Sequence, residues 1–174
     1  MIILAGKKEK CDKGMLGGIL VSWYVKTFQD LSPHKWYEMA KLRSDVFIVE
    51  QTSAYHEFDD LDQQSLHLYY EDRGQVVSYC RIIPEGYVYS EATISRVIVK
   101  KSHRKTGLGK QLLKRAVEVA SEFNAKPIQI QAEQYLTTFY QSFGFEVISE
   151  PYLDCDIYHV DMIRRATDVS SQTF

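Results

Sequence analysis

Basic residues and two glycines come together between Val99 and Ala120, in the stretch VKKSHRKTGLGKQLLKRAVEVA, just ahead of a run with helical periodicity. The first N–H groups of a helix have no intrahelical acceptor, and the helix dipole adds partial positive charge at that end. Gly107 and Gly109 lack the Cβ atoms that would keep a ligand away from the backbone. The basic side chains nearest to them are Arg104, Lys105 and Lys110. The stretch therefore predicts a cradle for an anion such as a pyrophosphate.

The same turn also fits a tight strand-to-helix connection with a solvated run of charge, and this alternative stays open on spacing alone. Two nucleotide motifs do not fit. A P-loop needs glycine where Arg104 stands and Ser or Thr where Gln111 follows Lys110. A dinucleotide fingerprint needs a third glycine, and Leu112 occupies its position. Phosphoryl transfer and hydride transfer therefore have no support from the sequence.

Length and composition suit one globular domain, because 45% of the 174 residues are hydrophobic. The net charge of −2 argues against a nucleic-acid-binding protein, as does the acidic stretch at 57–62. The start MIILAGKKEK has too short an apolar run for a signal peptide. The segment MLGGILVSWYV is interrupted by glycines and a serine, so it cannot span a bilayer. We expect a cytoplasmic protein with no membrane role.

The cysteines are odd in number and widely spaced, at Cys11, Cys80 and Cys155. They form neither a disulfide framework nor a CxxC zinc pair, so we expect reduced thiols and no metal site. Residues 1–18 lack periodicity and end in Gly-Gly. We therefore expect a poorly ordered leader at 1–18, a single domain at 19–166 and a flexible tail at 167–174.

Hydrophobic patterning predicts an α/β fold of the α+β kind, with a mixed sheet. Ser32 and Pro33 can begin a helix, and Arg73-Gly74 joins two alternating segments into a hairpin. From Leu108 onward, apolar residues recur at helical spacing. We expect strands at 19–28, 66–72, 76–84, 93–100, 127–132, 145–149 and 157–164, and helices at 32–47, 108–124 and 135–144. A polar loop or short helical turns should fill 49–65.

The pattern Arg-x-x-Gly-x-Gly at 104–109 follows a strand and opens a long helix. It resembles the signature of the GNAT superfamily of acyl-coenzyme A-dependent N-acyltransferases. The stretch AEQYLTTFYQSFGF at 132–145 resembles that family's downstream helix. The stretches LRSDVFIVEQ at 42–51 and ISRVIVKK at 94–101 resemble its ElaA-like branch. PYLDCDIYH at 151–159 departs from the glycine-containing acidic turn of that branch.

The resemblance implies a GNAT-like fold with a mostly antiparallel twisted sheet that is splayed between strands 93–100 and 127–132. The pantetheine arm of acetyl-CoA would lie between them, and one backbone N–H would polarise the thioester carbonyl. On this reading the cofactor-binding residues are Val97, Ile98 and Val99 of the strand and Arg104, Lys105, Thr106, Gly107, Leu108, Gly109 and Lys110 of the turn.

The resemblance further implies that an amine attacks the thioester directly, without a covalent enzyme intermediate. Tyr140 would then protonate the departing thiolate, although by itself it also fits a packed aromatic residue. Glu133, just after a splayed strand, is the first candidate for the base that deprotonates the amine. Further candidates are His67, Glu50 and His159, each of which also fits a solvated or structural side chain.

Two arginines alternate with apolar residues in predicted strands, Arg81 and Arg96. If they face the acceptor groove, they favour an acceptor with a carboxylate or phosphate. They fit equally well as partners of Asp59, Asp60 or Asp62 that brace the fold. Spacing leaves both alternatives open.

The function that follows is an N-acetyltransferase with a coenzyme A thioester and an amine-bearing acceptor as its partners. A non-catalytic acyl-CoA sensor or interaction module is the alternative, and Tyr140 with Glu133 favours the enzyme. A nucleic-acid binder using the Lys100–Lys110 cluster is disfavoured by the net charge. A homodimer is left open.

Overall fold

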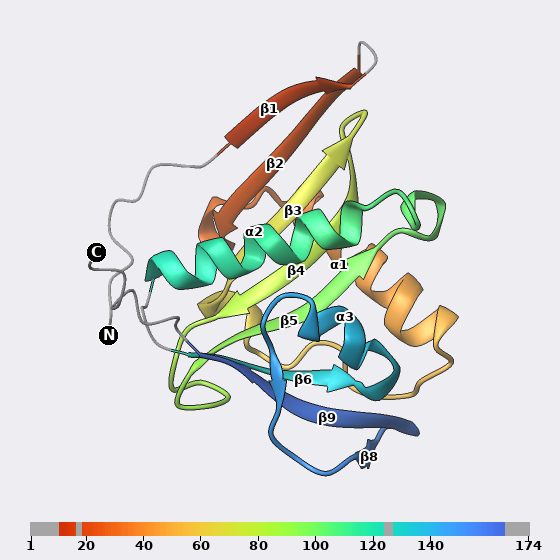
Figure 1. The fold of residues 1–174 in the computed structure, drawn as a ribbon. Helices are drawn as coiled ribbons and strands as arrows, with labels where there is room; N and C mark the ends of the chain where they lie inside the picture. Colours follow the sequence, from red (N-terminus) through yellow and green to blue (C-terminus); the bar gives the residue numbers. More distant parts are fainter. Residues whose placement is uncertain (1–10, 17–18, 124–126, 166–174) are drawn as a thin grey trace, which may run out of the picture.

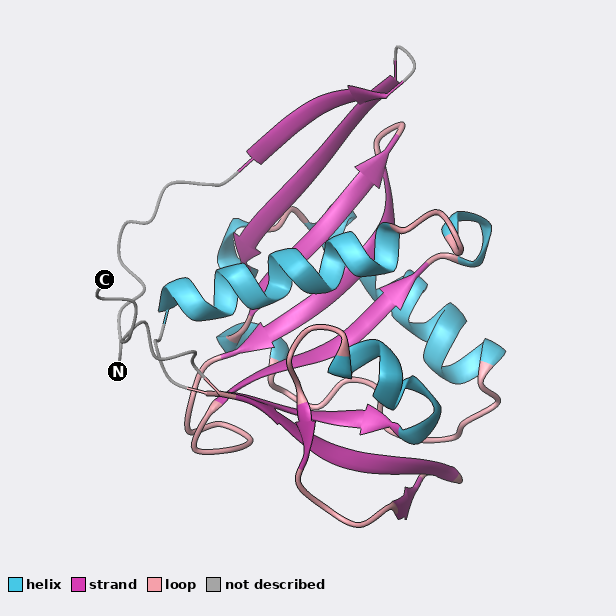
Figure 2. Ribbon diagram, viewed as in Figure 1, coloured by secondary structure: helices cyan, strands magenta, loops and turns pink. Residues whose placement is uncertain are grey.

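The computed structural model describes residues 11–16, 19–123 and 127–165, and one mixed sheet of nine strands dominates this part of the chain (Figures 1 and 2). The order is β1-β2-β3-β4-β5-β6-β9-β7, and β8 pairs with β9. Neighbouring strands are antiparallel except β5 and β6, which are parallel. The strands are β1 (Cys11–Leu16), β2 (Ile19–Thr27), β3 (Leu66–Asp72), β4 (Gln75–Ile83), β5 (Ala92–Val99), β6 (Ile128–Glu133), β7 (Glu146–Val147), β8 (Tyr152–Asp154) and β9 (Ile157–Arg164).

The helices are α1 (Pro33–Arg43), α2 (Leu108–Phe123) and α3 (Thr137–Gln141) within the described residues. The start of α1 is as predicted, because the Ser32 hydroxyl accepts the Lys35 N–H at 3.3 Å and Pro33 takes the first position. The helical path continues as a π-helical segment, η2 (Ser44–Glu50). Single 3-10 turns lie at Phe28–Asp30, Asp62–Gln64, Lys101–His103 and Gln134–Leu136.

Helices cover the two faces of the sheet, with α2 across the front and α1 behind (Figure 1). The buried residues of α2 repeat at the predicted helical spacing, and they pack on Leu68 and Cys80 of the sheet. Met39 and Leu42 of α1 pack on Tyr69 and Tyr79, which point to the opposite face. The α2 stripe is Leu108, Leu112, Leu113, Ala116, Val119 and Ala120. The predicted mixed α/β fold with a splayed, mostly antiparallel sheet is therefore confirmed.

Several predicted boundaries need correction. Residues 11–16 form β1 and pair with β2, whereas we placed them in a leader outside the fold. The rest of that predicted leader, residues 1–10 and 17–18, and the predicted tail at 167–174 lie outside the described residues. The predicted helix at 135–144 is a 3-10 turn followed by the short α3. The segment 145–149 contributes only the two-residue β7, and β8 was not predicted.

No helix among the described residues has both the length and the apolar character needed to cross a bilayer.

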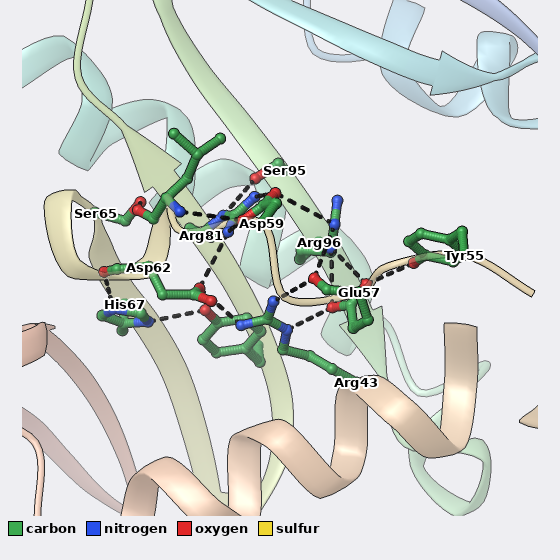
Figure 3. A network of polar contacts seen from close by, with 12 residues as sticks. Arg43, Tyr55, Glu57, Asp59, Asp62, Ser65, His67, Arg81, Ser95 and Arg96 are labelled. Atoms are coloured by element: carbon green, nitrogen blue, oxygen red, sulfur yellow. Dashed lines mark hydrogen bonds and ion pairs between the residues drawn. The ribbon is translucent and has the colours of Figure 1, made fainter. Parts of the chain in front are cut away.

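His67, a candidate base, lies in the core and not in the cavity described below, so that candidacy is wrong. A carbonyl only accepts, so Nε2–H donates to the Asp62 carbonyl oxygen at 3.0 Å, and Nδ1 accepts from the Tyr79 hydroxyl at 2.8 Å (Figure 3). Both ring nitrogens are thus used in the neutral form. Burial lowers the pKa of His67 to about 4.

This buried imidazole should make the fold sensitive to mild acid. The folded pKa of about 4 lies below the ordinary value of 6.5, so the unfolded chain binds more protons between these values and stability falls as pH falls. His67 alone should cost about 2 kcal/mol of unfolding free energy between pH 7 and pH 5. Urea unfolding at both pH values should show a smaller loss in His67→Gln than in the parent protein. An equal loss in the two proteins would contradict this assignment.

Candidate active site

β5 and β6 pair at only two positions and then separate. The paired residues are Ala92 with Ile128 and Thr93 with Gln129. Beyond them, β6 continues to pair with β9 through Glu133, while β5 stays with β4. A cavity of about 640 Å³ lies between the two strands and is lined by both. We call this separation the β5–β6 gap.

Val97 and Val99 present their backbone groups to this gap. The Lys100 N–H donates to the Val77 oxygen of β4 at 2.8 Å, and Ile98 pairs with Tyr79. Because backbone groups alternate sides along a strand, Val97 and Val99 must face away from β4. The Arg104 Nε atom reaches the Val99 oxygen from that side at 2.9 Å. The backbone of Ile98 instead faces β4, and its side chain is buried, so Ile98 offers no backbone contact to the gap.

A β-bulge at Arg96 sets this orientation. Ser95 pairs with Arg81 and Ile98 with Tyr79, so Arg96 and Val97 together stand opposite one residue of β4. Arg96 has a φ of 54°, in the left-handed region that is costly for a residue with a Cβ. Such a bulge bends its strand and re-aims the groups beyond it. β5 therefore turns away from β6 where the cavity begins.

The glycine turn lies at the end of the same strand, before α2. Gly107 has a φ of 86°, and its oxygen accepts the Gln111 N–H at 3.2 Å. The N–H groups of residues 108–110 come before Gln111, so they have no acceptor within the helix. A Cβ at Gly107 would meet nothing within 4 Å, so glycine is needed there for its φ. Thr106 Oγ1 donates to the His103 oxygen at 2.8 Å and ties the turn together.

Arg104 points toward Glu50 as well as toward the gap. Its guanidinium forms a two-pronged ion pair with the Glu50 carboxylate, and this contact lowers the pKa of Glu50. The Arg104 N–H donates to the Lys101 oxygen at 3.4 Å. Glu50 thus lines the cavity as the partner of an arginine, which leaves it poorly suited to serve as a base.

Tyr140 is 7% exposed and lines the same cavity as Val97 and Val99. Its ring packs edge-on against Phe139 and Phe145, which fixes the side chain on the short α3. Burial, and then the nearby charge of Glu133, raises the pKa of the Tyr140 hydroxyl. The hydroxyl therefore stays protonated at neutral pH and can donate a proton.

Glu133, the last residue of β6, lines the cavity close to Tyr140. Gln51 donates its side-chain N–H to Glu133 at 2.6 Å from the opposite wall, and the Tyr135 hydroxyl also bonds to Glu133. Burial and this bond raise the pKa of Tyr135 to about 12. Gln51 and Tyr135 were not predicted. Gln51 lies at the end of the stretch LRSDVFIVEQ, but Glu133 is 82 residues away, so residue spacing could not indicate their contact.

His159 also lines the cavity and pairs with Glu133 across β6 and β9. Its Nδ1 lies 2.9 Å from the Ile157 oxygen, and a carbonyl only accepts, so Nδ1 carries the proton. Nε2 then keeps its lone pair in the neutral ring. His159 therefore remains a candidate base beside Glu133.

Arg81 and Arg96 belong to a buried ion network, shown in Figure 3. Arg81 holds Asp59 with two contacts of 2.6 and 2.7 Å, and also reaches Asp62. The network joins three arginines, Arg43, Arg81 and Arg96, to three carboxylates, Glu57, Asp59 and Asp62.

The charges of this network are balanced among themselves. Burial alone would raise the pKa of Asp59, but hydrogen bonds and charge from Arg81, with charge from Arg96, lower it to about 2. Arg81 is 1% exposed and its guanidinium is fully engaged. The alternative in which these arginines brace the fold is therefore the correct one, and they give no reason to expect an anionic acceptor.

No group of three or more His, Cys, Asp and Glu side chains comes together as a metal site in the part of the chain that the structure describes.

Comparison with known proteins agrees with this geometry. Residues 28–166 match the acetyltransferase (GNAT) domain family. A UPF0039 protein of Synechocystis is 35% identical over 83% of this chain and 96% of its own length. A crystal structure of an acyl-CoA N-acyltransferase from Pseudomonas aeruginosa superimposes with a TM-score of 0.79 at 33% identity, over 83% of this chain and 99% of that one. The crystal structure of Escherichia coli ElaA gives a TM-score of 0.79 at 30% identity with the same coverage. The chain therefore belongs to the GNAT acetyltransferase family, in its ElaA-like branch.

Proposed function

We propose that the protein transfers an acetyl group from acetyl-CoA to a primary amine by direct attack of the amine on the thioester. The observation that supports this most strongly is the continuity of one surface. Val97, Val99, Tyr140 and Glu133 line the same cavity, together with Arg104 at the start of the glycine turn.

The pantetheine arm would lie along β5 as an additional strand in the β5–β6 gap. It would use the groups of Val97 and Val99 that β4 does not use. The pyrophosphate would accept from the N–H groups at 107–110, beside the positive end of α2. Arg104 would have to release the Val99 oxygen so that the pantetheine arm could bond to it.

The proton transfers follow from the positions of two side chains. Glu133 takes a proton from the ammonium form of the acceptor, and the lone pair that this frees forms the new C–N bond with the acetyl carbon. The nitrogen then loses its second proton to water. The C–S bond breaks, and Tyr140 gives its proton to the leaving sulfur. The raised pKa of Tyr140 makes it a weaker acid than the thiol it serves, so its contribution should be modest, on the order of 10- to 100-fold.

The described cysteines support transfer without an acyl-enzyme. Cys80 is fully buried, and burial raises the pKa of its thiol. Cys155 is exposed and lines the cavity, and slight desolvation of its thiol, with the hydrogen bond and negative charge of Asp154, raises the pKa of this thiol as well. Both thiols therefore stay protonated at neutral pH and are poor nucleophiles.

A non-catalytic acyl-CoA sensor is the second candidate. It would use the same strand and turn but would not need Glu133 to be held by two donors from separate elements. Thiol release in the presence of amines separates the two functions, because a sensor binds acetyl-CoA without releasing CoA.

Replacing Gly107 by Glu should abolish acetyl-CoA binding, because it places a carboxylate where the pyrophosphate belongs. Gly86→Glu is a matched control, since Gly86 has a φ of 81° against 86° for Gly107 and open space around it as well. Both variants carry the same backbone strain, so calorimetry should show lost affinity in the first alone. Equal affinity in a folded Gly107→Glu protein would mean that the pyrophosphate binds elsewhere.

Replacing Tyr140 by Phe should lower kcat by roughly 10- to 100-fold and leave acetyl-CoA affinity nearly unchanged. The ring keeps its packing against Phe139 and Phe145 and loses only the proton donor. Single-turnover measurement of acyl transfer isolates the relevant step. Acyl transfer at the parental rate would mean that water or CoA itself, and not Tyr140, supplies the proton to the leaving sulfur.

A further inference from the structure

The charge around the cavity is uneven once its ion pairs are assigned. Arg104 is paired with Glu50, and Arg81 and Arg96 are committed to the buried network. Among the described residues that line the cavity, two carboxylates remain without an Arg or Lys partner, Glu133 and Asp154. The part of the cavity lining that holds Glu133 and Asp154 therefore carries negative charge that no described arginine or lysine pairs with.

Asp154 and Glu133 lie on one side of the sheet, because Asp154 contacts a side chain on the same face of β6 as Glu133. Asp154, at the end of β8, accepts the Gln131 side-chain N–H at 3.0 Å. Gln131 stands two residues before Glu133 on β6, so both side chains project to the same face, about 7 Å apart along the strand. Both carboxylates are held by neutral amides, from Gln131 and from Gln51. An amide donor fixes a carboxylate in place without neutralising it.

We infer that the acceptor carries a second cationic group, which Asp154 binds while Glu133 faces the nitrogen that is acetylated. This inference rests on the proposed acetyl transfer and adds the substrate class to it. A short diamine such as 1,4-diaminobutane carries two such cationic groups and represents this class of acceptor. A carboxylate on the acceptor would instead meet like charge, which disfavours binding.

Asp154 is thus a specificity residue of the acceptor site. It is the last residue of β8. The turn that follows it has two residues in the left-handed region, Cys155 at φ 48° and Asp156 at φ 64°. Ser53 Oγ ties this turn to the opposite wall through the Cys155 oxygen at 3.2 Å. Asp154 therefore comes from a segment anchored on both sides of the cavity.

The test compares acceptors of one chain length with different end groups. Thiol release from acetyl-CoA is measured with 1,4-diaminobutane, 1-aminobutane and 4-aminobutanoate. The kcat/KM of the parent protein for the diamine should be at least tenfold above that for the monoamine, which is the scale of one charged hydrogen bond. Its kcat/KM for the amino acid should be the lowest of the three. Asp154→Asn should bring the diamine-to-monoamine ratio close to one, mainly through KM. Asp156→Asn removes the same charge two residues away, outside the cavity lining, and should keep the parental ratio.

A charge-reversal variant distinguishes loss of this specific contact from misfolding. Asp154→Lys should raise the kcat/KM for 4-aminobutanoate above that for 1,4-diaminobutane, which a loss of structure would not do. A parental ratio near one, or an unchanged ratio in Asp154→Asn, would overturn the inference while acetyl transfer to 1-aminobutane still upheld the proposed function. Acetyl-CoA binding without transfer to any of the three amines would overturn both.

Discussion

The buried network of three arginines and three carboxylates is the interaction on which the cavity depends. Arg43 comes from the end of α1, Arg81 from β4 and Arg96 from the bulge in β5, while the carboxylates all come from the segment between η2 and β3. The network thus fastens one long connection to three separate elements. Arg43, Arg81, Glu57 and Asp62 are buried, so removing the partner of one of them would leave an uncompensated buried charge, at a cost of roughly 3–5 kcal/mol.

This network also explains why a strained residue can persist in β5. Arg96 holds a left-handed φ, and its guanidinium is fixed by Glu57, which in turn is held by Arg43 and by the Tyr55 hydroxyl. Local strain is retained where surrounding contacts determine the conformation. The bulge then turns Val97 and Val99 toward the β5–β6 gap. A fold-stabilising cluster and the strand that borders the β5–β6 gap are therefore linked through a single residue.

The parts of the fold with a local pattern could be predicted from the sequence. The apolar spacing of α2 indicated its buried stripe, and Arg73-Gly74, both with positive φ, form the two-residue turn predicted between β3 and β4. The splay between β5 and β6 came from the family resemblance alone. Strand β1 was missed because CDKGML has neither alternation nor a β-branched residue, and its pairing with β2 supplies the order.

The candidate site, too, could be predicted only where its residues stand in a local sequence pattern. The turn at 104–110 and Tyr140 stood within recognisable motifs, whereas the partners of Arg81 and Arg96 lie 14 to 39 residues away and leave no trace in spacing. His67 shows why a titratable residue in a strand is ambiguous, because its surroundings in three dimensions decide whether it can accept a proton. The contacts of Gln51 and Asp154 can be recognised only in the folded structure, where segments far apart in the sequence line one cavity.

The central claim is that β5 and the glycine turn form one continuous binding surface for CoA. A ¹⁵N-resolved amide NMR titration with CoA tests it directly, because it reports on each backbone N–H. The account predicts shifts at Val97, Val99 and residues 107–110, with smaller changes at Ile98, whose N–H faces β4. Saturable CoA binding that leaves the amides of Val97, Val99 and the turn unmoved would contradict the account.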